Sequence, residues 1–166
     1  MGLSFGPEPL LADLLEDGDS LRHWAGKEKG ILAVVNGCFD PLHAGHLALI
    51  HRAVRLGDKT LMLVNMDDHI REVKGREPYL SLPDRTLLLR SLRGVSAVHP
   101  FAGPDPTIAL RAIADGRKGR VADIMVKGGD YRGRVLPERG WVRRIVFLDR
   151  TGESSSDLIA RMRGER

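Results

Sequence analysis

Short apolar runs alternate, from residue 30 onward, with segments whose apolar residues recur at helical spacing. Such alternation is typical of a mostly parallel β-sheet that helices cover on both faces. We therefore predict an α/β fold of three layers built on a five-stranded sheet. The strands are expected at residues 31–36, 60–65, 95–99, 124–126 and 142–148, and the helices near residues 45–56, 83–92, 106–114 and 156–163.

The length of the chain and its first residues suggest the domain organisation. A chain of 166 residues can bury one hydrophobic core, so we expect one domain over residues 30–166. Residues 1–29 are expected to form a helical extension that packs on the outside of this domain. In the extension, Ser20 is placed to cap a short helix that ends near Trp24. An earlier helix is indicated by leucines at helical spacing, namely Leu10, Leu11, Leu14 and Leu15.

The composition excludes several classes of protein. Hydrophobic residues make up 42% of the chain and charged residues 29%, which is ordinary for a soluble globular protein. Cys38 is the only cysteine, so a disulfide framework is excluded and the cytoplasm is the expected compartment. The first 30 residues lack a basic start followed by an apolar run, and no stretch is apolar enough to span a bilayer. We therefore expect neither a signal peptide nor a membrane partner.

Basic residues are distributed unevenly along the chain. Residues 111–166 hold 14 basic and 8 acidic residues, whereas residues 1–110 hold 12 basic and 14 acidic residues. A basic region of this kind can serve a nucleic acid or a small polyphosphate ligand. Aromatic residues are few and no RNA- or DNA-binding motif is present, so we favour the polyphosphate ligand over a nucleic acid.

The junction after the first predicted strand carries the clearest functional signal. The strand is followed by Gly37, a turn at Asp40-Pro41 and a helical pattern that begins near Gly45. His43 and His46 lie three residues apart here, on one side of the first helical turn. A helix N-terminus attracts anions through its unpaired N–H groups and partial positive charge, and α/β sheets bind ligands beyond the carboxyl ends of their strands. The junction therefore predicts a phosphate-binding site.

Several further motifs occur in order along the chain. They are Val64-Asn65-Met66-Asp67, Lys74-Gly75-Arg76, Asp84-Arg85, Val126-Lys127-Gly128-Gly129-Asp130-Tyr131 and Ser154-Ser155-Ser156. Together with Gly37-Cys38-Phe39-Asp40 and His43-Ala44-Gly45-His46, they resemble the signature of the cytidylyltransferase-like nucleotidyltransferases over about residues 31–163. The resemblance implies a Rossmann-like fold and the transfer of a nucleoside monophosphate to a phosphorylated acceptor. It also implies a homodimer.

The resemblance implies three sets of site residues. The catalytic set is His43, His46 and Lys74, with Lys74 on a polar loop that reaches the triphosphate or the acceptor. The nucleotide is expected to contact Gly37, Cys38, Phe39, Asp40, Gly45, Lys127, Gly128, Ser154, Ser155 and Ser156. The acceptor is expected to contact Asn65, Arg76, Arg85 and Asp130.

These residue types suit the chemistry of nucleotidyl transfer. The acceptor phosphate attacks the α-phosphorus in line with the departing pyrophosphate, and negative charge accumulates that the protein must stabilise. His43 and His46 can donate hydrogen bonds to phosphate oxygens. Mg²⁺ should bridge the phosphates, because it binds substrate oxygens more readily than protein cages. Asp40 is the expected contact to Mg²⁺, directly or through water.

Two branches of the family remain open. The run Lys127-Gly128-Gly129-Asp130-Tyr131 resembles the adenylyltransferase domain that makes ADP-heptose from heptose 1-phosphate. The segment from Arg150 to Ser156 is more similar to glycerol-3-phosphate cytidylyltransferase, although serines alone replace the Ser-Thr-Thr type of signature. We favour ATP and a sugar 1-phosphate, with CTP and a polyol phosphate as the alternative. A third possibility is a nucleotide- or RNA-binding regulatory protein that keeps the fold without turnover.

Other chemistries at the junction are disfavoured. A zinc site would need Cys or His ligands beyond His43 and His46, and no such cluster is present. Cys38 lacks an indicated histidine–acid partner, and the transfer needs no covalent step, so a cysteine nucleophile is not expected. The remaining histidines are expected to be surface or structural residues, namely His23, His51, His69 and His99.

Overall fold

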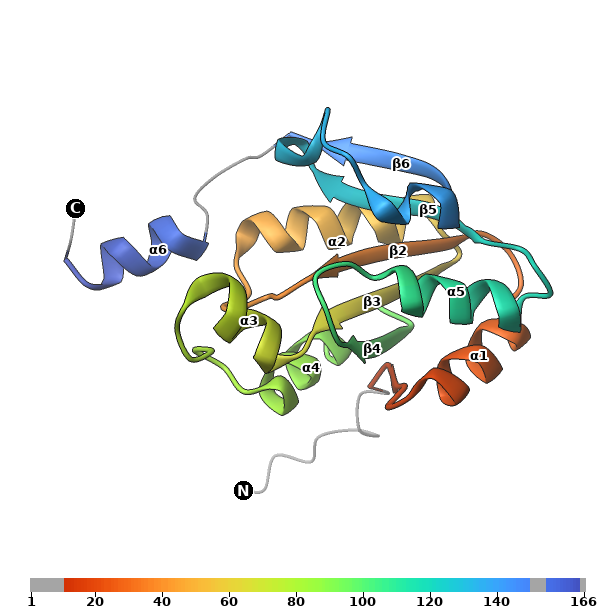
Figure 1. Cartoon of the computed structure of the whole chain (residues 1–166), viewed down its shortest axis with the longest axis horizontal. Coiled ribbons are helices and arrows are strands. Elements are labelled where there is room, and N and C mark those ends of the chain that lie inside the picture. The colour runs from red at the N-terminus through yellow and green to blue at the C-terminus, as the bar shows by residue number, and fades with distance from the viewer. Residues whose placement is uncertain (1–10, 150–154, 165–166) are drawn as a thin grey trace, which may run out of the picture.

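Six parallel strands form one sheet in the order β1-β4-β3-β2-β5-β6 (Figure 1). The computed structural model describes residues 11–149 and 155–164 of the chain. The strands are β1 (Asp13–Leu14), β2 (Leu32–Gly37), β3 (Lys59–Asn65), β4 (Ala97–Phe101), β5 (Ala122–Gly128) and β6 (Val142–Leu148). The predicted parallel α/β fold is thus confirmed, but the predicted count of five strands is wrong because β1 adds a sixth.

Helices cover both faces of the sheet, as expected for three layers (Figure 1). The helices are α1 (Gly18–Lys27), α2 (Ala44–Leu56), α3 (Asp67–Lys74), α4 (Leu82–Arg90), α5 (Thr107–Gly116) and α6 (Ser155–Met162), with short 3₁₀ helices η1 (Gly129–Tyr131) and η2 (Pro137–Trp141). Among the described residues, no helix combines the length and the apolar character that crossing a bilayer requires.

The hydrophobic core is divided by the sheet into two clusters. Val34 of β2 and Leu61 of β3 pack with α1 and α5 on one face, through residues such as Leu21 and Ile113. The neighbouring strand residues point the other way and pack with α2 and α4, as Val35, Met62, Ile50 and Leu89 illustrate. Successive side chains of a strand face opposite sides, so an uninterrupted apolar run fills both clusters at once. This arrangement holds the carboxyl ends of β2, β3 and β5 in fixed register.

The segment before residue 30 differs from its prediction. The helix expected around Leu14 and Leu15 is wrong, because Asp13 and Leu14 form β1 and pair with the edge of β4. The Leu15 N–H donates to the Val98 carbonyl over 2.9 Å, and the Leu15 side chain is buried in the core. Leu10 lies outside the described residues. Residues 11–29 therefore contribute to the sheet and its core instead of packing on the outside.

The cap of α1 also differs from its prediction. Asp17, and not Ser20, is the N-cap residue, and its carboxylate accepts a hydrogen bond from the Ser20 N–H over 2.7 Å. The Ser20 hydroxyl in turn accepts from the Asp17 N–H over 3.1 Å, which completes a capping box. The predicted short helix is present, but Ser20 stands at its third position and the helix continues to Lys27.

The buried carboxylate of Asp123, near the amino-terminal end of β5, makes the stability of the fold depend on pH. Asp123 accepts hydrogen bonds from the Leu32 N–H at 3.0 Å, from Arg120 at 2.9 Å and from Arg117 at 3.0 Å. Burial alone would raise the pKa of Asp123, but these hydrogen bonds outweigh it and lower the pKa to about 2 from 3.8. The carboxylate therefore contributes stability above pH 3.8, and that contribution is lost as the pH falls toward 2.

We expect acid to weaken the fold through this group. Lowering the pH from 6 to 3 should remove about 1 kcal/mol of the free energy of unfolding through Asp123 alone. Urea unfolding at the two pH values measures the change, and an Asp123→Asn variant serves as the matched control because it carries no titrating group there. The same pH-dependent loss in wild type and variant would show that Asp123 is not responsible.

Candidate active site

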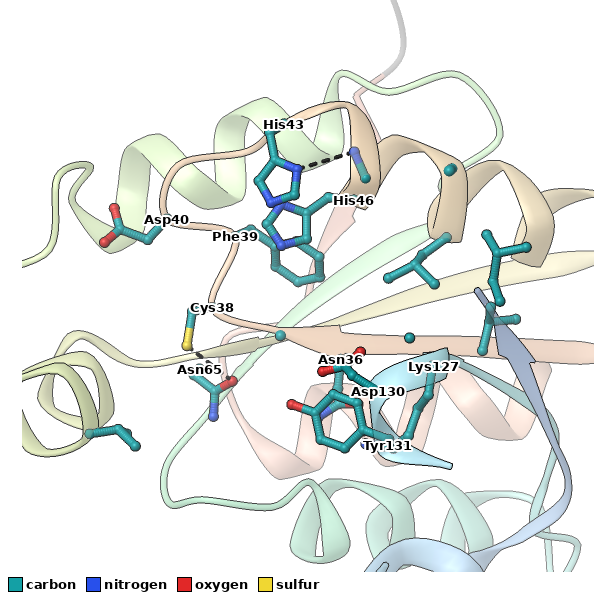
Figure 2. Close-up of a pocket in the computed structure, with 18 of the residues that line it drawn as sticks. Asn36, Cys38, Phe39, Asp40, His43, His46, Asn65, Lys127, Asp130 and Tyr131 are labelled. Atoms are coloured by element: carbon teal, nitrogen blue, oxygen red, sulfur yellow. Dashed lines mark hydrogen bonds between the residues drawn. The ribbon is translucent and has the colours of Figure 1, made fainter. Parts of the chain in front are cut away.

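A cavity of about 510 Å³ opens at the carboxyl ends of β2, β3 and β5 (Figure 2). Its walls come from the β2–α2 junction, from α3, and from the end of β5 with η1. The predicted site residues that line it are Gly37, Cys38, Phe39, Asp40, His43, Gly45, His46, Asn65, Lys74, Lys127, Gly128 and Asp130. The sequence motifs therefore converge on one cavity at the edge of the sheet where ligands of such folds bind.

The two histidines of the junction stand side by side at the start of α2. His43 is the N-cap residue, and its Nδ1 accepts a hydrogen bond from the Gly45 N–H over 3.1 Å. Because Nδ1 is the acceptor, the neutral imidazole of His43 carries its proton on Nε2. The ring centroids of His43 and His46 lie 3.8 Å apart. Figure 2 shows the two rings next to each other at the start of α2. The junction thus presents two stacked imidazoles together with the N-terminal N–H groups of the helix.

Phe39 supports this pair from below. Its side chain is 1% exposed and packs in the core cluster beneath α2, and its ring meets His46 edge-on at 5.1 Å (Figure 2). Phe39 has a φ of 53°, a left-handed conformation that is uncommon for a bulky residue and is frequent near functional sites. A Cβ at Gly37 would lie 3.3 Å from the Phe39 ring, so a glycine there lets the ring pack under the loop.

Asp40 and Arg76 form an ion pair at the edge of the cavity. The Asp40 carboxylate accepts from the Arg76 guanidinium at 2.8 Å and from the Leu80 N–H at 2.9 Å, and its side chain is 1% exposed. Arg76 also stacks over the Tyr79 ring at 4.0 Å and does not line the cavity. The predicted contact between Arg76 and the acceptor stays a prediction. Each oxygen of Asp40 has one donor, and its predicted contact with Mg²⁺, directly or through water, stays a prediction.

The described ranges hold no cluster of side chains that could form a protein metal site. Over residues 11–149 and 155–164, no group of three or more His, Cys, Asp or Glu side chains is placed to hold a metal ion. That Mg²⁺ bridges the phosphates of the nucleotide stays a prediction.

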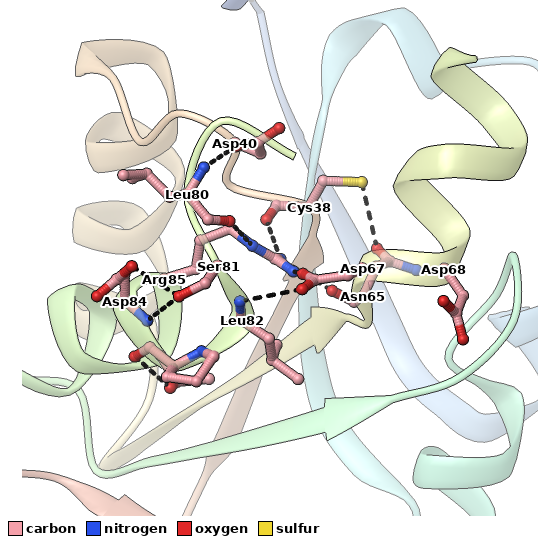
Figure 3. Close-up of polar contacts among 12 residues, drawn as sticks. Cys38, Asp40, Asn65, Asp67, Asp68, Leu80, Ser81, Leu82, Asp84 and Arg85 are labelled. Carbon is pink, nitrogen blue, oxygen red and sulfur yellow. Dashed lines mark hydrogen bonds and ion pairs between the residues drawn. The ribbon is translucent and has the colours of Figure 1, made fainter. Parts of the chain in front are cut away.

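Arg85 lies beneath the cavity and joins the loops around it (Figure 3). Its side chain is fully buried, and its guanidinium donates to the carbonyls of Cys38 at 2.7 Å and Asn65 at 2.8 Å. It also donates to the Leu80 carbonyl at 3.1 Å and forms an ion pair with Asp67 at the start of α3. Arg85 does not line the cavity. Its guanidinium is taken up by these contacts within the protein, and the predicted contact with the acceptor stays a prediction.

Cys38 and Asn65 line the cavity from neighbouring strand ends. The Cys38 thiol donates to the Asn65 side-chain oxygen over 3.8 Å (Figure 3). The Asn65 amide donates to the Gly103 carbonyl over 3.0 Å. Burial raises the pKa of the Cys38 thiol, an effect that the nearby cations of Lys74 and Arg85 oppose only in part. A thiol that stays protonated is a poor nucleophile, which agrees with the expectation for Cys38.

Lys127 lines the opposite part of the cavity, but its charge is already paired. Its Nζ lies 2.5 Å from a carboxylate oxygen of Glu138, 3.2 Å from the Asn36 side-chain oxygen and 4.6 Å above the Tyr131 ring (Figure 2). The side chains of Lys127 and Glu138 are 6% and 3% exposed. The predicted contact between Lys127 and the nucleotide stays a prediction, and its ammonium has a carboxylate partner within the protein. Glu138, its partner, was not among the predicted residues.

Helix α3 supplies a wall that the sequence did not predict. The segment around Lys74 was expected to be a polar loop, but Lys74 is the last residue of α3, and Gly75 ends the helix in the left-handed conformation. His69, Val73 and Lys74 of this helix all line the cavity. His69, expected to be a surface or structural residue, therefore lies in the cavity wall. By contrast, His99 is structural as expected, since it is buried and its Nδ1 donates to the Leu15 carbonyl over 2.7 Å.

The three predicted serines are only partly within the described chain. Ser154 lies outside it, and Ser155 and Ser156 begin α6 with their side chains not described. Their contact with the nucleotide stays a prediction. Further lining residues that sequence reasoning missed are Asn36, Ala48, Leu49, Pro104, Val126, Tyr131, Leu148 and Asp149.

Known proteins resemble this chain in sequence. Residues 34–157 match the Cytidylyltransferase-like family. The chain is 39% identical over 166 residues to the bifunctional protein HldE of Streptomyces coelicolor, covering 94% of this chain and 34% of that protein. It is 38% identical over 140 residues to the bifunctional protein HldE of Aeromonas salmonicida, covering 80% of this chain and 28% of that protein. The chain thus spans about a third of the length of these relatives.

Solved structures share the fold at lower identity. The lipopolysaccharide core biosynthesis protein of Thermoplasma volcanium aligns with a TM-score of 0.59 and 21% identity, covering 75% of this chain and 100% of its own. A pantoate-beta-alanine ligase of Francisella tularensis aligns with a TM-score of 0.62 and 12% identity, covering 87% of this chain and 69% of its own. The fold, the histidine junction and the match over residues 34–157 agree, and the chain belongs to the cytidylyltransferase-like family that its ordered motifs predicted.

Proposed function

We propose that this chain is a nucleotidyltransferase that transfers AMP from ATP to a sugar 1-phosphate similar to heptose 1-phosphate, with release of pyrophosphate. The observation that carries the proposal is the stacked pair His43 and His46 at the N-terminus of α2, opening into a cavity of about 510 Å³. Membership of the cytidylyltransferase-like family and similarity to bifunctional HldE proteins support it.

The reaction needs charge stabilisation more than proton transfer. An oxygen of the acceptor phosphate forms a bond to the α-phosphorus of the nucleotide, and the bond from that phosphorus to the bridging oxygen of pyrophosphate breaks. The acceptor is already an anion, so no general base is required. His43 would donate through Nε2, the ring atom that its capping hydrogen bond leaves protonated. The N–H groups of α2 and the Lys74 ammonium would add positive charge where negative charge accumulates.

The substrates follow from the relatives and from one motif. Both relatives described above are HldE proteins, and Lys127-Gly128-Gly129-Asp130-Tyr131 resembles the domain that makes ADP-heptose. Gly128, Asp130 and Tyr131 of this motif line the cavity. These observations favour ATP and heptose 1-phosphate over CTP and glycerol 3-phosphate. The requirement for Mg²⁺ bound to the nucleotide, the homodimer and the cytoplasmic location are parts of the proposal that rest on the family resemblance and the composition.

A substrate screen tests the proposal directly. ATP, CTP, GTP and UTP are each combined with heptose 1-phosphate or glycerol 3-phosphate, and pyrophosphate release is measured with Mg²⁺ present. We expect turnover with ATP and heptose 1-phosphate, and none when the acceptor is omitted. Turnover with CTP and glycerol 3-phosphate alone would overturn the favoured branch. Binding to RNA that persists at high salt, without pyrophosphate release from any pair, would support the regulatory alternative.

A further inference from the structure

Helix α3 places three side chains along one wall of the cavity. His69 lies one turn before Val73 on the same face of the helix, and Lys74 follows as its last residue; all three line the cavity. Val73 is 63% exposed and provides an apolar surface, whereas Lys74 provides a cation that forms no ion pair with any described residue. Polar, apolar and cationic groups side by side suit a ligand that carries hydroxyl groups and a phosphate.

The imidazole of His69 is a neutral hydrogen-bonding group that the described protein leaves unused. Among residues 11–149 and 155–164, its ring nitrogens make no hydrogen bond and no ion pair. Burial lowers the pKa of His69, and the weaker attraction of Glu72 does not reverse the shift. A neutral imidazole donates through one nitrogen and accepts through the other, which matches a hydroxyl group better than a phosphate dianion.

The position of His69 relative to the histidine pair decides which substrate it meets. In the sheet, β2 lies between β3 and β5, so the His43 and His46 junction stands between the α3 wall and the wall at Lys127 and Tyr131. In the proposed reaction the α-phosphorus must lie between the nucleoside and the acceptor. Gly128, at the end of β5, is predicted to contact the nucleotide, and Asn65, at the end of β3 next to α3, is predicted to contact the acceptor. We therefore place the acceptor against the α3 wall, with Asp130 as its predicted contact from the opposite side.

We propose, on the basis of the proposed function, that His69 hydrogen-bonds to a hydroxyl group of the phosphorylated acceptor and helps to select it. Lys74 binds the phosphate of the same acceptor from the end of α3. His69 is thus a specificity-determining residue of the acceptor site. It takes no part in stabilising the charge at the α-phosphorus.

Kinetics of His69 variants test this role. One hydrogen bond between neutral groups corresponds to about a tenfold change in affinity, so His69→Ala should raise the KM for heptose 1-phosphate about tenfold. The kcat and the KM for ATP should stay within about twofold, because neither depends on that hydrogen bond. His69→Gln should recover part of the affinity, since an amide also donates and accepts. His51→Ala is the matched control, because His51 is an exposed histidine of α2 outside the cavity.

A binding measurement separates this inference from the proposed function. The ring C–H signals of ¹³C-labelled histidine are recorded by NMR, and the His69 signal is assigned from its loss in His69→Gln. Heptose 1-phosphate, added to protein holding an ATP analogue with a methylene bridge between its α- and β-phosphates, should shift the His69 signal, and the analogue alone should not.

The outcomes distinguish a failure of the proposed function from a failure of the inference about His69. If wild type turns over no substrate pair in the screen, the proposed function fails, while an unshifted His69 signal overturns the inference on its own. If wild type is active but His69→Ala leaves the KM for heptose 1-phosphate unchanged, the inference is overturned and the proposed function stands. If His69→Ala raises the KM for ATP as much as the KM for the acceptor, His69 contacts the nucleotide, and this result also overturns the inference.

Discussion

Replacing His46 with alanine should lower kcat by about 10²–10³-fold, the usual loss when one donor to a developing negative charge is removed. His46 stacks on His43 at 3.8 Å and meets Phe39 edge-on at 5.1 Å, so its ring is fixed at the N-terminus of α2. A group held in this way stabilises the transition state without rearranging. The Kd for ATP should change by less than about threefold, because ground-state phosphates keep their contacts with the helix N-terminus.

The measurement pairs steady-state turnover with a separate determination of nucleotide affinity. His51→Ala serves as the control, since His51 lies on the same helix but is exposed and outside the cavity. Both variants should unfold at the temperature of the wild type to within a few degrees. Turnover by His46→Ala close to that of the wild type would refute the assigned role. A loss of ATP affinity as large as the loss of kcat would indicate that His46 contributes to binding alone.

The parts of the fold and the site that the sequence predicted share one physical property. β2 and β3 are buried on both faces, so each reads as an uninterrupted apolar run, and the helices between them carry apolar residues at helical spacing. The histidine junction was predictable because a glycine, a proline turn and a helix start follow one another within a few residues. These signals are local, and local signals survive in a sequence without its structure.

The elements that the sequence did not predict lack such signals. β1 has two residues and is defined by its pairing with β4, which is distant in the chain. α3 buries a single residue, Ile70, so it has no apolar repeat, although Asp67 and Asp68 in its first turn and Gly75 at its end fit a helix. Those terminal residues are the local signal that predicts α3, and with it the position of His69 in the cavity wall.

Side-chain roles were harder to predict, because a charged residue can face a ligand or another protein group. Arg76, Arg85 and Lys127 all stand in motifs that predicted contact with a ligand, yet each is paired within the protein with Asp40, Asp67 or Glu138. Their partners come from segments up to 36 residues away in the chain, as for Arg76 and Asp40. Spacing along the sequence does not specify such pairs.

Replacing Glu138 with glutamine should lower the free energy of unfolding by about 3–5 kcal/mol, because it leaves the buried Lys127 ammonium without its carboxylate. The two side chains are 3% and 6% exposed and lie 2.5 Å apart, so water cannot easily replace the lost partner. The Asn36 side-chain oxygen and the Tyr131 ring remain near the Lys127 ammonium but carry no net charge. Most domains unfold with about 5–15 kcal/mol, so a loss of this size is easily measured by urea unfolding.

The double variant Lys127→Met with Glu138→Leu separates pairing from ligand binding. Apolar side chains that replace both members of a buried pair often cost little, so the double variant should be more stable than Glu138→Gln by about 2 kcal/mol or more. If the main role of Lys127 is to pair with Glu138, the double variant should also keep its affinity for ATP within about threefold. A stable double variant that has lost its affinity for ATP would instead show that Lys127 binds the nucleotide. If the double variant is no more stable than Glu138→Gln, the contribution of Glu138 to the free energy of unfolding does not come from its ion pair with Lys127.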